Sequence, residues 1–269
     1  MKRSDRLVSL TRYFLEHPKE HMSLPYFSDK YDAAKSSISE DLSIVDRVMQ
    51  KEGIGYLQTL PGASGGVSFI PEFSRERSHQ FIDELCHTLE DSSRILPGGY
   101  LYMSDILGDP KMVNQIGHVL ASTFSNLDID VVMTVATKGI PLAYATAAVL
   151  NVPVVIVRRD PKVTEGSSVS INYVSGSSRK IQTMVLPKRS LTDNANVCII
   201  DDFMKAGGTI NGMVSLLDEF NAKVQAIGVL AEADDEEDER VVENYTSLVK
   251  ITHVDIKEKT IEVRHGNVT

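Results

Sequence analysis

Two neighbouring carboxylates and a glycine-rich turn stand close together in one stretch of the chain. The stretch reads Val197-Cys198-Ile199-Ile200-Asp201-Asp202-Phe203-Met204-Lys205-Ala206-Gly207-Gly208-Thr209. Glycines let backbone N–H groups approach a phosphate, the Thr209 hydroxyl adds a donor, and the N-terminus of a following helix favours negative charge. The carboxylates of Asp201 and Asp202 repel phosphate, but they accept hydrogen bonds from ribose hydroxyls and bind Mg²⁺. A ribose phosphate therefore suits both halves of this stretch.

A second anion-binding turn is predicted at residues 135–141. Its sequence is Val135-Ala136-Thr137-Lys138-Gly139-Ile140-Pro141. It follows an apolar run and precedes a helical pattern, so that backbone amides and Lys138 are available to an anion. The cations of the long polar stretch 158–191 are further candidates, because a long loop inside a compact domain is usually functional. These cations are Arg158, Arg159 and Lys162, which we expect to meet either a pyrophosphate or DNA, with a solvated hairpin as the alternative.

Alternating short apolar runs and helical patterns place these turns on a parallel sheet from residue 100 onward. We expect strands at 100–103, 131–135, 154–157, 197–200 and 224–230, and helices near 81–89, 110–125, 141–150 and 209–220. Such alternation is typical of an α/β domain with helices on both faces of the sheet. Ligands of these sheets bind outside the carboxyl ends of the strands, where both turns lie.

The first 73 residues have a different pattern, with three helical segments followed by two short strands. We expect helices at 5–15 with Ser4 as N-cap, at 23–31, and at 37–51 with a Ser37…Glu40 capping box, then strands at 54–60 and 67–71 joined by a turn at 61–66. This order is that of a winged helix-turn-helix, which places the start of the third helix in a DNA major groove. A helical interaction domain with an incidental hairpin is the alternative.

The predicted DNA contacts are few and weakly basic. They comprise Lys35, Ser36, Ser37 and Ser39 at the start of the third helix, and Lys2 and Arg3 in the N-terminal segment. Hydroxyls and a cation suit phosphates and base edges, whereas Glu40 and Asp41 would repel DNA if they faced it. The turn 61–66 has no Lys or Arg. We therefore expect weak binding by one copy and a need for a homodimer.

The formal net charge of −9 argues against a nucleic-acid partner only until its location is considered. Residues 231–269 carry 5 basic and 11 acidic side chains, and eight of those acids fall within 231–243. We interpret 231–243 as one acidic surface segment. The first twelve residues have the opposite charge, with four cations against Asp5. The charge therefore indicates which part of the chain avoids DNA.

The remaining composition favours a cytoplasmic protein without metal ligands. Only Cys86 and Cys198 occur, which is too few for a disulfide framework. No apolar run reaches the length of a membrane span, so we expect no membrane association. His17 and His21 are separated by Pro18, which prevents a shared helical face, and no metal site is predicted.

The segment from about 75 to 265 resembles the type I phosphoribosyltransferases, in particular the xanthine and adenine enzymes. Residues 197–209 correspond to their ribose-phosphate signature, 135–141 to their pyrophosphate loop, and 158–191 to their flexible hairpin. The stretch from Tyr100-Leu101-Tyr102 to Asp109-Pro110 is similar to the part that forms their purine pocket. The fold class is thus α/β, with a winged helix-turn-helix at 1–73 followed by a phosphoribosyltransferase-like parallel-sheet domain at 74–269.

With both parts together, the chain resembles the purine operon repressors of low-GC Gram-positive bacteria. That resemblance implies a dimeric, cytoplasmic repressor that binds double-stranded DNA at purine-gene control regions. It also implies a pocket that senses phosphoribosyl pyrophosphate (PRPP) as inducer, with Mg²⁺ as companion ion and no required cofactor, and guanosine tetra- or pentaphosphate as competitor. The implied effector-binding residues are Tyr102, Thr137, Lys138, Gly139, Arg158, Arg159, Asp201, Asp202, Phe203, Met204, Lys205, Ala206, Gly207, Gly208 and Thr209.

Lys205 departs from the enzymes, which commonly have a small hydroxyl residue at this place. A cation beside the phosphate favours tight anion binding over turnover. No set of residues that recognises a specific base is evident, so we predict no catalytic residues. Two alternatives remain open: an active purine phosphoribosyltransferase with an N-terminal assembly domain, and, against the winged helix, an RNA-binding attenuator.

Overall fold

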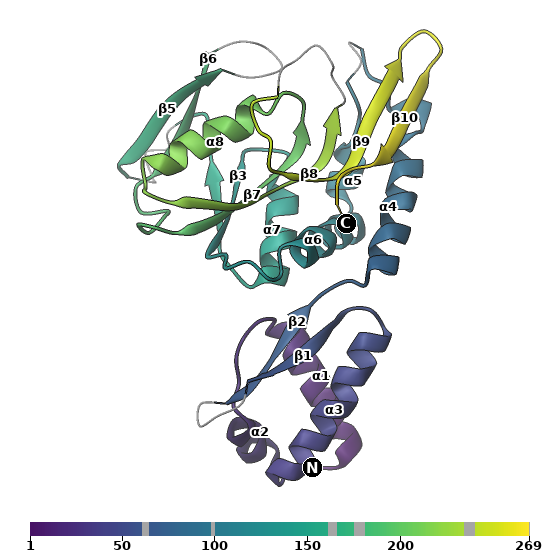
Figure 1. Ribbon diagram of the computed structural model, residues 1–269, viewed down its shortest axis with the longest axis vertical. Helices are drawn as coiled ribbons and strands as arrows, with labels where there is room; N and C mark the ends of the chain where they lie inside the picture. The colour runs from purple at the N-terminus through teal and green to yellow at the C-terminus, as the bar shows by residue number, and fades with distance from the viewer. Residues whose placement is uncertain (61–64, 98–99, 161–165, 175–180, 234–239, 269) are drawn as a thin grey trace.

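The computed structural model describes residues 1–60, 65–97, 100–160, 166–174, 181–233 and 240–268. Figure 1 shows two bodies, a small one that contains the N-terminus and a larger one built around a sheet. Parts of three predicted features lie outside the described residues: the hairpin turn at 61–64, Lys162, and the acidic run 234–239. Among the described residues, no helix is long and apolar enough to span a membrane.

The N-terminal body has the three helices and the hairpin that the sequence predicts. Its elements are α1 (Arg3–Glu16), α2 (Leu24–Tyr31), α3 (Lys35–Lys51), β1 (Gly55–Leu60) and β2 (Gly66–Pro71). The strands β1 and β2 pair antiparallel. The apolar faces of the helices meet in one core in which Leu10, Phe14, Phe27 and Ile38 are fully buried. Aromatic rings and aliphatic side chains at helical spacing thus form a core that belongs to this body.

Two of the predicted helix starts are wrong. The N-cap of α1 is Lys2, and Ser4 instead contacts the neighbouring Asp5. The helix α3 begins at Lys35, two residues before the predicted start, with Ala34 as an N-cap that has no capping side chain. Ser37 therefore lies inside the first turn, where no capping box forms. The prediction for α2 is confirmed, since Ser23 Oγ accepts a hydrogen bond from the Tyr26 N–H at 3.4 Å.

The larger body is a six-stranded sheet in the order β10-β9-β8-β7-β3-β4. These strands are β3 (Val131–Val135), β4 (Val154–Val157), β7 (Asn196–Met204), β8 (Lys223–Ala233), β9 (Thr246–Asp255) and β10 (Thr260–His265). All neighbours pair parallel except β10, which is antiparallel to β9. A separate antiparallel hairpin, β5 (Ser168–Val174) with β6 (Ile181–Pro187), stands where the flexible hairpin is predicted.

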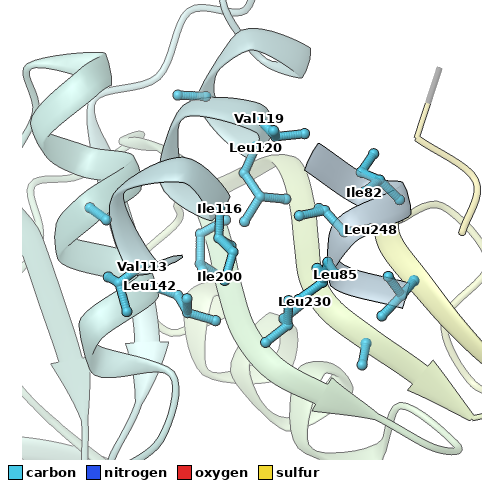
Figure 2. Close-up of a cluster of buried hydrophobic side chains, with 14 of the residues drawn as sticks. Ile82, Leu85, Val113, Ile116, Val119, Leu120, Leu142, Ile200, Leu230 and Leu248 are labelled. Atoms are coloured by element: carbon cyan, nitrogen blue, oxygen red, sulfur yellow. The ribbon is translucent and has the colours of Figure 1, made fainter. Parts of the chain in front are cut away.

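Helices cover both faces of this sheet, as its apolar strands require. They are α4 (Arg75–Leu89), the short 3₁₀ turn at Ser92–Arg94, α5 (Ser104–Gly108), α6 (Pro110–Thr123), α7 (Ile140–Leu150) and α8 (Gly208–Asp218). On one face, side chains of α4, α6 and α7 meet Ile200, Leu230 and Leu248 of the strands (Figure 2). On the other face, α8 and the β5–β6 hairpin bury a second cluster around Met133 and Met213.

Four expectations about the larger body are corrected. Residues 100–103 form no strand, because only Leu101 makes a bridge, to Ile95. The strand β7 continues beyond Ile200 to Met204, so the acid pair lies within the strand and not in a loop. The strands β9 and β10 were not predicted. Glu232 is also no surface acid, since it belongs to β8 and only 3% of it is exposed.

A small set of contacts joins the two bodies just after β2. The backbone N–H of Phe73 donates to Ser122 Oγ at 2.8 Å, and the Phe73 ring stacks on His118 with 4.6 Å between ring centroids. The guanidinium of Arg77 lies 4.1 Å from the centroid of the same ring. Lys19 of the small body donates to the Ser125 carbonyl at 3.2 Å. The end of α6 is therefore in direct contact with the N-terminal body.

Candidate functional sites

Two adjoining cavities lie at the carboxyl ends of β3, β4 and β7. Their volumes are about 740 Å³ and 510 Å³, and we call them the turn cavity and the arginine cavity. Both are lined by Lys138, Asp202, Phe203 and Thr209, so these four residues form the wall between them. The parallel strands bring the two predicted anion-binding turns together at this edge, as expected for the fold.

The turn cavity is lined by a polar, glycine-rich turn at one end and by apolar side chains at the other. Its polar end is the segment from Lys205 to Thr209, which leads into α8. Gly207 is the N-cap of α8 with a φ of +82°, a backbone conformation that glycine adopts without strain, and no side chain caps the helix there. The apolar end is lined by Leu96, Pro97, Tyr100, Leu101, Met103, Ile251 and Val254. This cavity suits a molecule with a phosphate at one end and a flat apolar group at the other.

The wall of the apolar end is held in place by a salt bridge. Arg94 makes two hydrogen bonds to Asp105, at 2.8 and 2.7 Å, and a third to the Thr88 carbonyl. The hydrogen bond from Arg94 lowers the pKa of Asp105. Because these two residues flank Tyr100 and Leu101, their pairing fixes the loop that carries both side chains into the cavity.

The arginine cavity is rich in hydrogen-bond donors and cations. It is lined by Val135, Ala136, Thr137, Lys138, Arg158, Arg159, Asp160, Asp201, Asp202, Phe203 and Thr209. Below it, Gly139 packs so closely that a side chain would not fit, because an added Cβ would lie 2.3 Å from Thr134 Oγ1 and 2.9 Å from Asp201 Oδ1. The three cations suit a di- or polyanion, and the three carboxylates of the same lining suit hydroxyl donors or a divalent cation that such an anion carries.

The two carboxylates of the acid pair have different environments. Asp201 is buried, and its Oδ1 accepts the Asp202 N–H at 2.9 Å. Burial, together with the neighbouring Asp202 charge, raises the pKa of Asp201 well above its ordinary value. The pKa of Asp202 is raised by burial, while Asp201 and Lys138 act in the opposite direction. Asp202 lines both cavities, whereas Asp201 lines the arginine cavity alone and also packs against Gly139.

Most of the predicted effector residues line these cavities. Gly139 is buried and lines neither of them, and Tyr102 does not line them either. Its backbone N–H donates to the Arg94 carbonyl at 2.8 Å, and Arg94 in turn donates to the Tyr102 carbonyl. Its side chain is exposed and lines neither cavity. The neighbouring Tyr100 lines the turn cavity instead. Ile251 and Val254 were missed because they lie on β9, which the sequence pattern did not reveal.

The start of α3 displays the side chains that the sequence singles out. Lys35, Ser36 and Ser39 are exposed and Ser37 is half-buried, as Lys2 is exposed just before α1. The exposed face continues along the helix through residues that sequence reasoning missed, namely Ser43, Arg47 and Gln50. Their spacing of three and four residues was the available signal, because such residues share one helical face.

Arg3 is exposed and pairs with the acid that follows Glu40, Asp41. Asp41 is fully buried, with Oδ1 2.9 Å from Arg3 Nε and Oδ2 2.5 Å from Arg6 Nε. Asp41 therefore does not face DNA and does not repel it, because its charge faces two arginines inside the body. Arg3 also pairs with Glu40 at 3.5 Å, so much of its charge is already compensated. Only Glu40 of the two acids remains exposed.

The comparisons with known proteins cover both bodies. Residues 2–71 match the family described as "Bacterial purine repressor, N-terminal", and residues 103–266 match the "Phosphoribosyl transferase domain". The chain is 59% identical to the purine biosynthesis transcriptional repressor PurR of Bacillus subtilis (strain 168), over 99% of this chain and 93% of that protein. It is 47% identical to the purine biosynthesis transcriptional activator PurR of Lactococcus lactis subsp. lactis (strain IL1403), over 100% and 98%.

A solved structure agrees with the architecture of the larger body. The APRTase of Giardia lamblia, in complex with 9-deazaadenine, matches 64% of this chain and 98% of its own with a TM-score of 0.54. The sequence identity is 21%, so this likeness concerns the fold alone.

Proposed function

Because this chain belongs to the family of bacterial purine-biosynthesis transcriptional regulators, we propose that it is a cytoplasmic, DNA-binding repressor of purine biosynthesis genes. The N-terminal body binds double-stranded DNA at purine-gene control regions, and the cavities of the larger body bind the effector. The observation that carries the second half is the pair of cavities joined at Lys138 and Asp202.

PRPP is the proposed inducer because its three parts match three parts of the site. Its 5′-phosphate suits the uncapped N-terminus of α8 at Gly207–Thr209, where amides and the helix dipole favour an anion. Its ribose hydroxyls suit the Asp202 carboxylate in the wall between the cavities. Its pyrophosphate suits the arginine cavity, with Arg158 and Arg159, and a Mg²⁺ ion carried by the pyrophosphate would complete the charge balance.

Guanosine tetra- or pentaphosphate is the proposed competitor. The apolar end of the turn cavity, with Tyr100 and Leu101, offers space for a purine ring next to the phosphate turn. The polyphosphate of such a nucleotide would occupy the same donors as PRPP. Two ligands that need the same groups exclude each other, so the ratio of their concentrations sets the DNA affinity.

We propose that the site senses and does not catalyse. Transfer to a purine base requires groups that hold the base and stabilise developing charge. Among the described residues at the apolar end of the turn cavity, Tyr100 is the only one with a polar side chain. Lys205 adds a cation beside the phosphate turn, which favours retention of the anion.

DNA binding is assigned to the exposed face of α3, and it requires a second copy of the chain. Along that face Lys35 and Arg47 are cations, while Ser36, Ser39 and Ser43 are small hydroxyls. A few phosphate contacts give only weak, salt-sensitive binding per copy. A homodimer doubles the contacts and reads two half-sites.

A gel-shift titration on a purine-gene control region, with and without PRPP and Mg²⁺, tests this proposal. We expect a specific complex that PRPP weakens, and a guanosine tetraphosphate addition that restores it. Unchanged DNA affinity at saturating PRPP would refute the sensor role. Incubation with purine bases, PRPP and Mg²⁺ tests the alternative, since nucleotide formation at enzyme-like rates would identify an active transferase.

A further inference from the structure

A buried carboxylate near the end of β8 organises the chain that follows the acidic run. Glu232 is 3% exposed, and its Oε1 accepts a hydrogen bond from Ser247 Oγ at 2.8 Å. Its Oε2 accepts from the Tyr245 hydroxyl and lies 2.6 Å from a guanidinium nitrogen of Arg240. A carboxylate is tolerated in such a place only when it is paired and hydrogen-bonded, and Glu232 meets both conditions.

Arg240 is held at both ends of its guanidinium. Besides Glu232, it donates to the Ala233 carbonyl at 3.1 Å and to the Tyr245 hydroxyl. These bonds hold Arg240 beside Ala233, which lines the turn cavity. The position of residue 240 is therefore set by the core of the sheet.

The two residues after Arg240 touch the phosphate turn itself. The Val241 N–H donates to the Ala206 carbonyl at 3.1 Å. Val242 is buried against Gly207, where an added Cβ would lie 3.1 Å from Val242 Cγ2. The segment 240–242, which we call the strap, therefore contacts the turn through one hydrogen bond and one apolar contact.

This contact sets the direction of a backbone donor. In a trans peptide the C=O and the following N–H point to opposite sides, so a carbonyl of Ala206 fixed toward Val241 turns the Gly207 N–H away from the strap. Anion binding at a helix N-terminus depends on several amides that point the same way before the ligand arrives. A turn without the strap would have to be ordered by the ligand, at the expense of affinity.

We propose that Glu232 and Arg240 are positioning residues, which hold the strap so that the Ala206–Thr209 turn is preformed for a phosphate monoester. The inference rests on the proposed function, because it assigns this turn to the 5′-phosphate of the effector. It also distinguishes the two anion sites, because the strap contacts Ala206 and Gly207, which line the turn cavity and do not line the arginine cavity.

Calorimetric titration of the Glu232→Gln variant with three ligands tests this assignment. We expect affinity for ribose 5-phosphate and PRPP to fall about tenfold, the size of one lost charge-assisted hydrogen bond. Affinity for inorganic pyrophosphate should change less than about twofold, and so should DNA affinity without effector. Glu262→Gln is the matched control, because Glu262 is an exposed carboxylate on β10 and should leave all affinities as they are.

Equal losses for ribose 5-phosphate and pyrophosphate, or no loss for either, would overturn the inference. A wild-type protein that binds neither PRPP nor ribose 5-phosphate would instead contradict the proposed function. Amide hydrogen exchange still tests the positioning role of the strap in that case, because this measurement needs no ligand. We expect Glu232→Gln to accelerate exchange at 207–209, and unchanged exchange would refute the positioning role.

A second variant guards against a failure of Glu232→Gln to fold. Val241→Pro removes the one N–H that reaches Ala206, at a side chain that is 53% exposed. Val241→Ala keeps this N–H and serves as its control. The same loss of ribose 5-phosphate affinity in the proline variant, absent in the alanine variant, supports the inference, and identical affinities in both contradict it.

Discussion

The two bodies of the molecule both bury aspartates, and they treat them in opposite ways. In the small body, Asp41 is fully buried between the guanidinium groups of Arg3 and Arg6. In the larger body, Asp201 is buried and the adjacent Asp202 is half-buried, and neither makes an ion pair with a residue that the structure describes. The first arrangement is complete without a ligand. The second leaves a need for positive charge or hydrogen-bond donors.

This difference assigns Asp41 to the stability of the small body and the acid pair of the larger body to ligand binding. A buried pair such as Asp41–Arg6 links α1 to α3, and the loss of one partner leaves the other uncompensated. Carboxylates whose pKa is raised by burial store an unfavourable interaction that a suitable ligand relieves. Perturbed carboxylates of this kind cluster at functional sites. The comparison leads to four predictions, each of which tests one side of it.

The largest effect is expected for Asp41→Ala. Removal of the carboxylate leaves Arg6 buried without a partner, so the free energy of unfolding should fall by about 3–5 kcal/mol. Chemical denaturation of the full chain measures this loss. The control is Glu40→Ala, whose exposed pair with Arg3 should contribute less than about 1 kcal/mol. Equal losses in both variants would mean that Asp41 is not the structural partner.

Asp202→Asn should lower effector affinity and leave stability intact, in contrast to Asp41→Ala. Its carboxylate lines both cavities, so effector affinity should fall by about 1.5–3 kcal/mol, the worth of hydrogen bonds to a charged group. Stability should stay the same or rise, because a charge with a raised pKa is removed. Calorimetry with PRPP and thermal unfolding measure the two quantities. Asp218→Asn, at the far end of α8, is the control for affinity.

The raised pKa values give a direction for pH dependence. The folded chain binds protons at Asp201 and Asp202 above their ordinary pKa, so its stability falls as pH rises through the interval from 3.8 to the raised values. Hydroxyl donors and Mg²⁺ favour the charged forms, so PRPP affinity should rise with pH in the same interval. The slope is at most about tenfold per pH unit for each proton released. A flat profile would contradict ligand contact with the pair.

The smallest effect concerns the DNA face of the small body. Lys35→Ala should lower the slope of log affinity against log salt by about one unit, since one phosphate contact is lost. Between 50 and 200 mM salt, this amounts to about a fourfold smaller change in affinity. Lys51→Ala is the control, because Lys51 lies in the last turn of the same helix. Identical slopes for Lys35→Ala and the wild type would remove Lys35 from the phosphate contacts.

Local patterns predicted the architecture well where they were strong. The apolar runs at 131–135 and 154–157 are β3 and β4, and the turn of 205–209 leads into α8 as its glycines indicate. Helix starts were less predictable, because the long-range pairing of Arg3 with Asp41 and Glu40 outweighs a local capping box at Ser37. The strand β9 was missed because its mixed sequence gives no clear alternation. The strand β10 does alternate from Ile261 to Arg264, and this signal was overlooked.

The site itself was predictable only in part. The two predicted anion-binding turns can be recognised in the sequence, because strand residues, charged residues and glycines follow one another within a few residues. The apolar wall does not, because it combines Tyr100 from a loop with Ile251 and Val254 from a strand 150 residues later along the chain. Likewise, the distinction between Asp201 and Asp202 depends on burial, which two identical neighbouring letters do not reveal. Tertiary packing supplies this information.

The contact between Phe73 and His118 determines how α6 is connected to the small body. The helix α6 starts directly after the loop and α5 that follow Met103 in the cavity wall, and it ends against the small body (Figure 1). Its 14 residues make a rigid rod of about 20 Å. Phe73 contacts Arg77 and His118 and donates a hydrogen bond to Ser122, so the end of α6 is fixed to the residue that follows the small body. Phe73 is itself buried in the core of the larger body, so the chain leaves the small body at a point that is packed directly on α6.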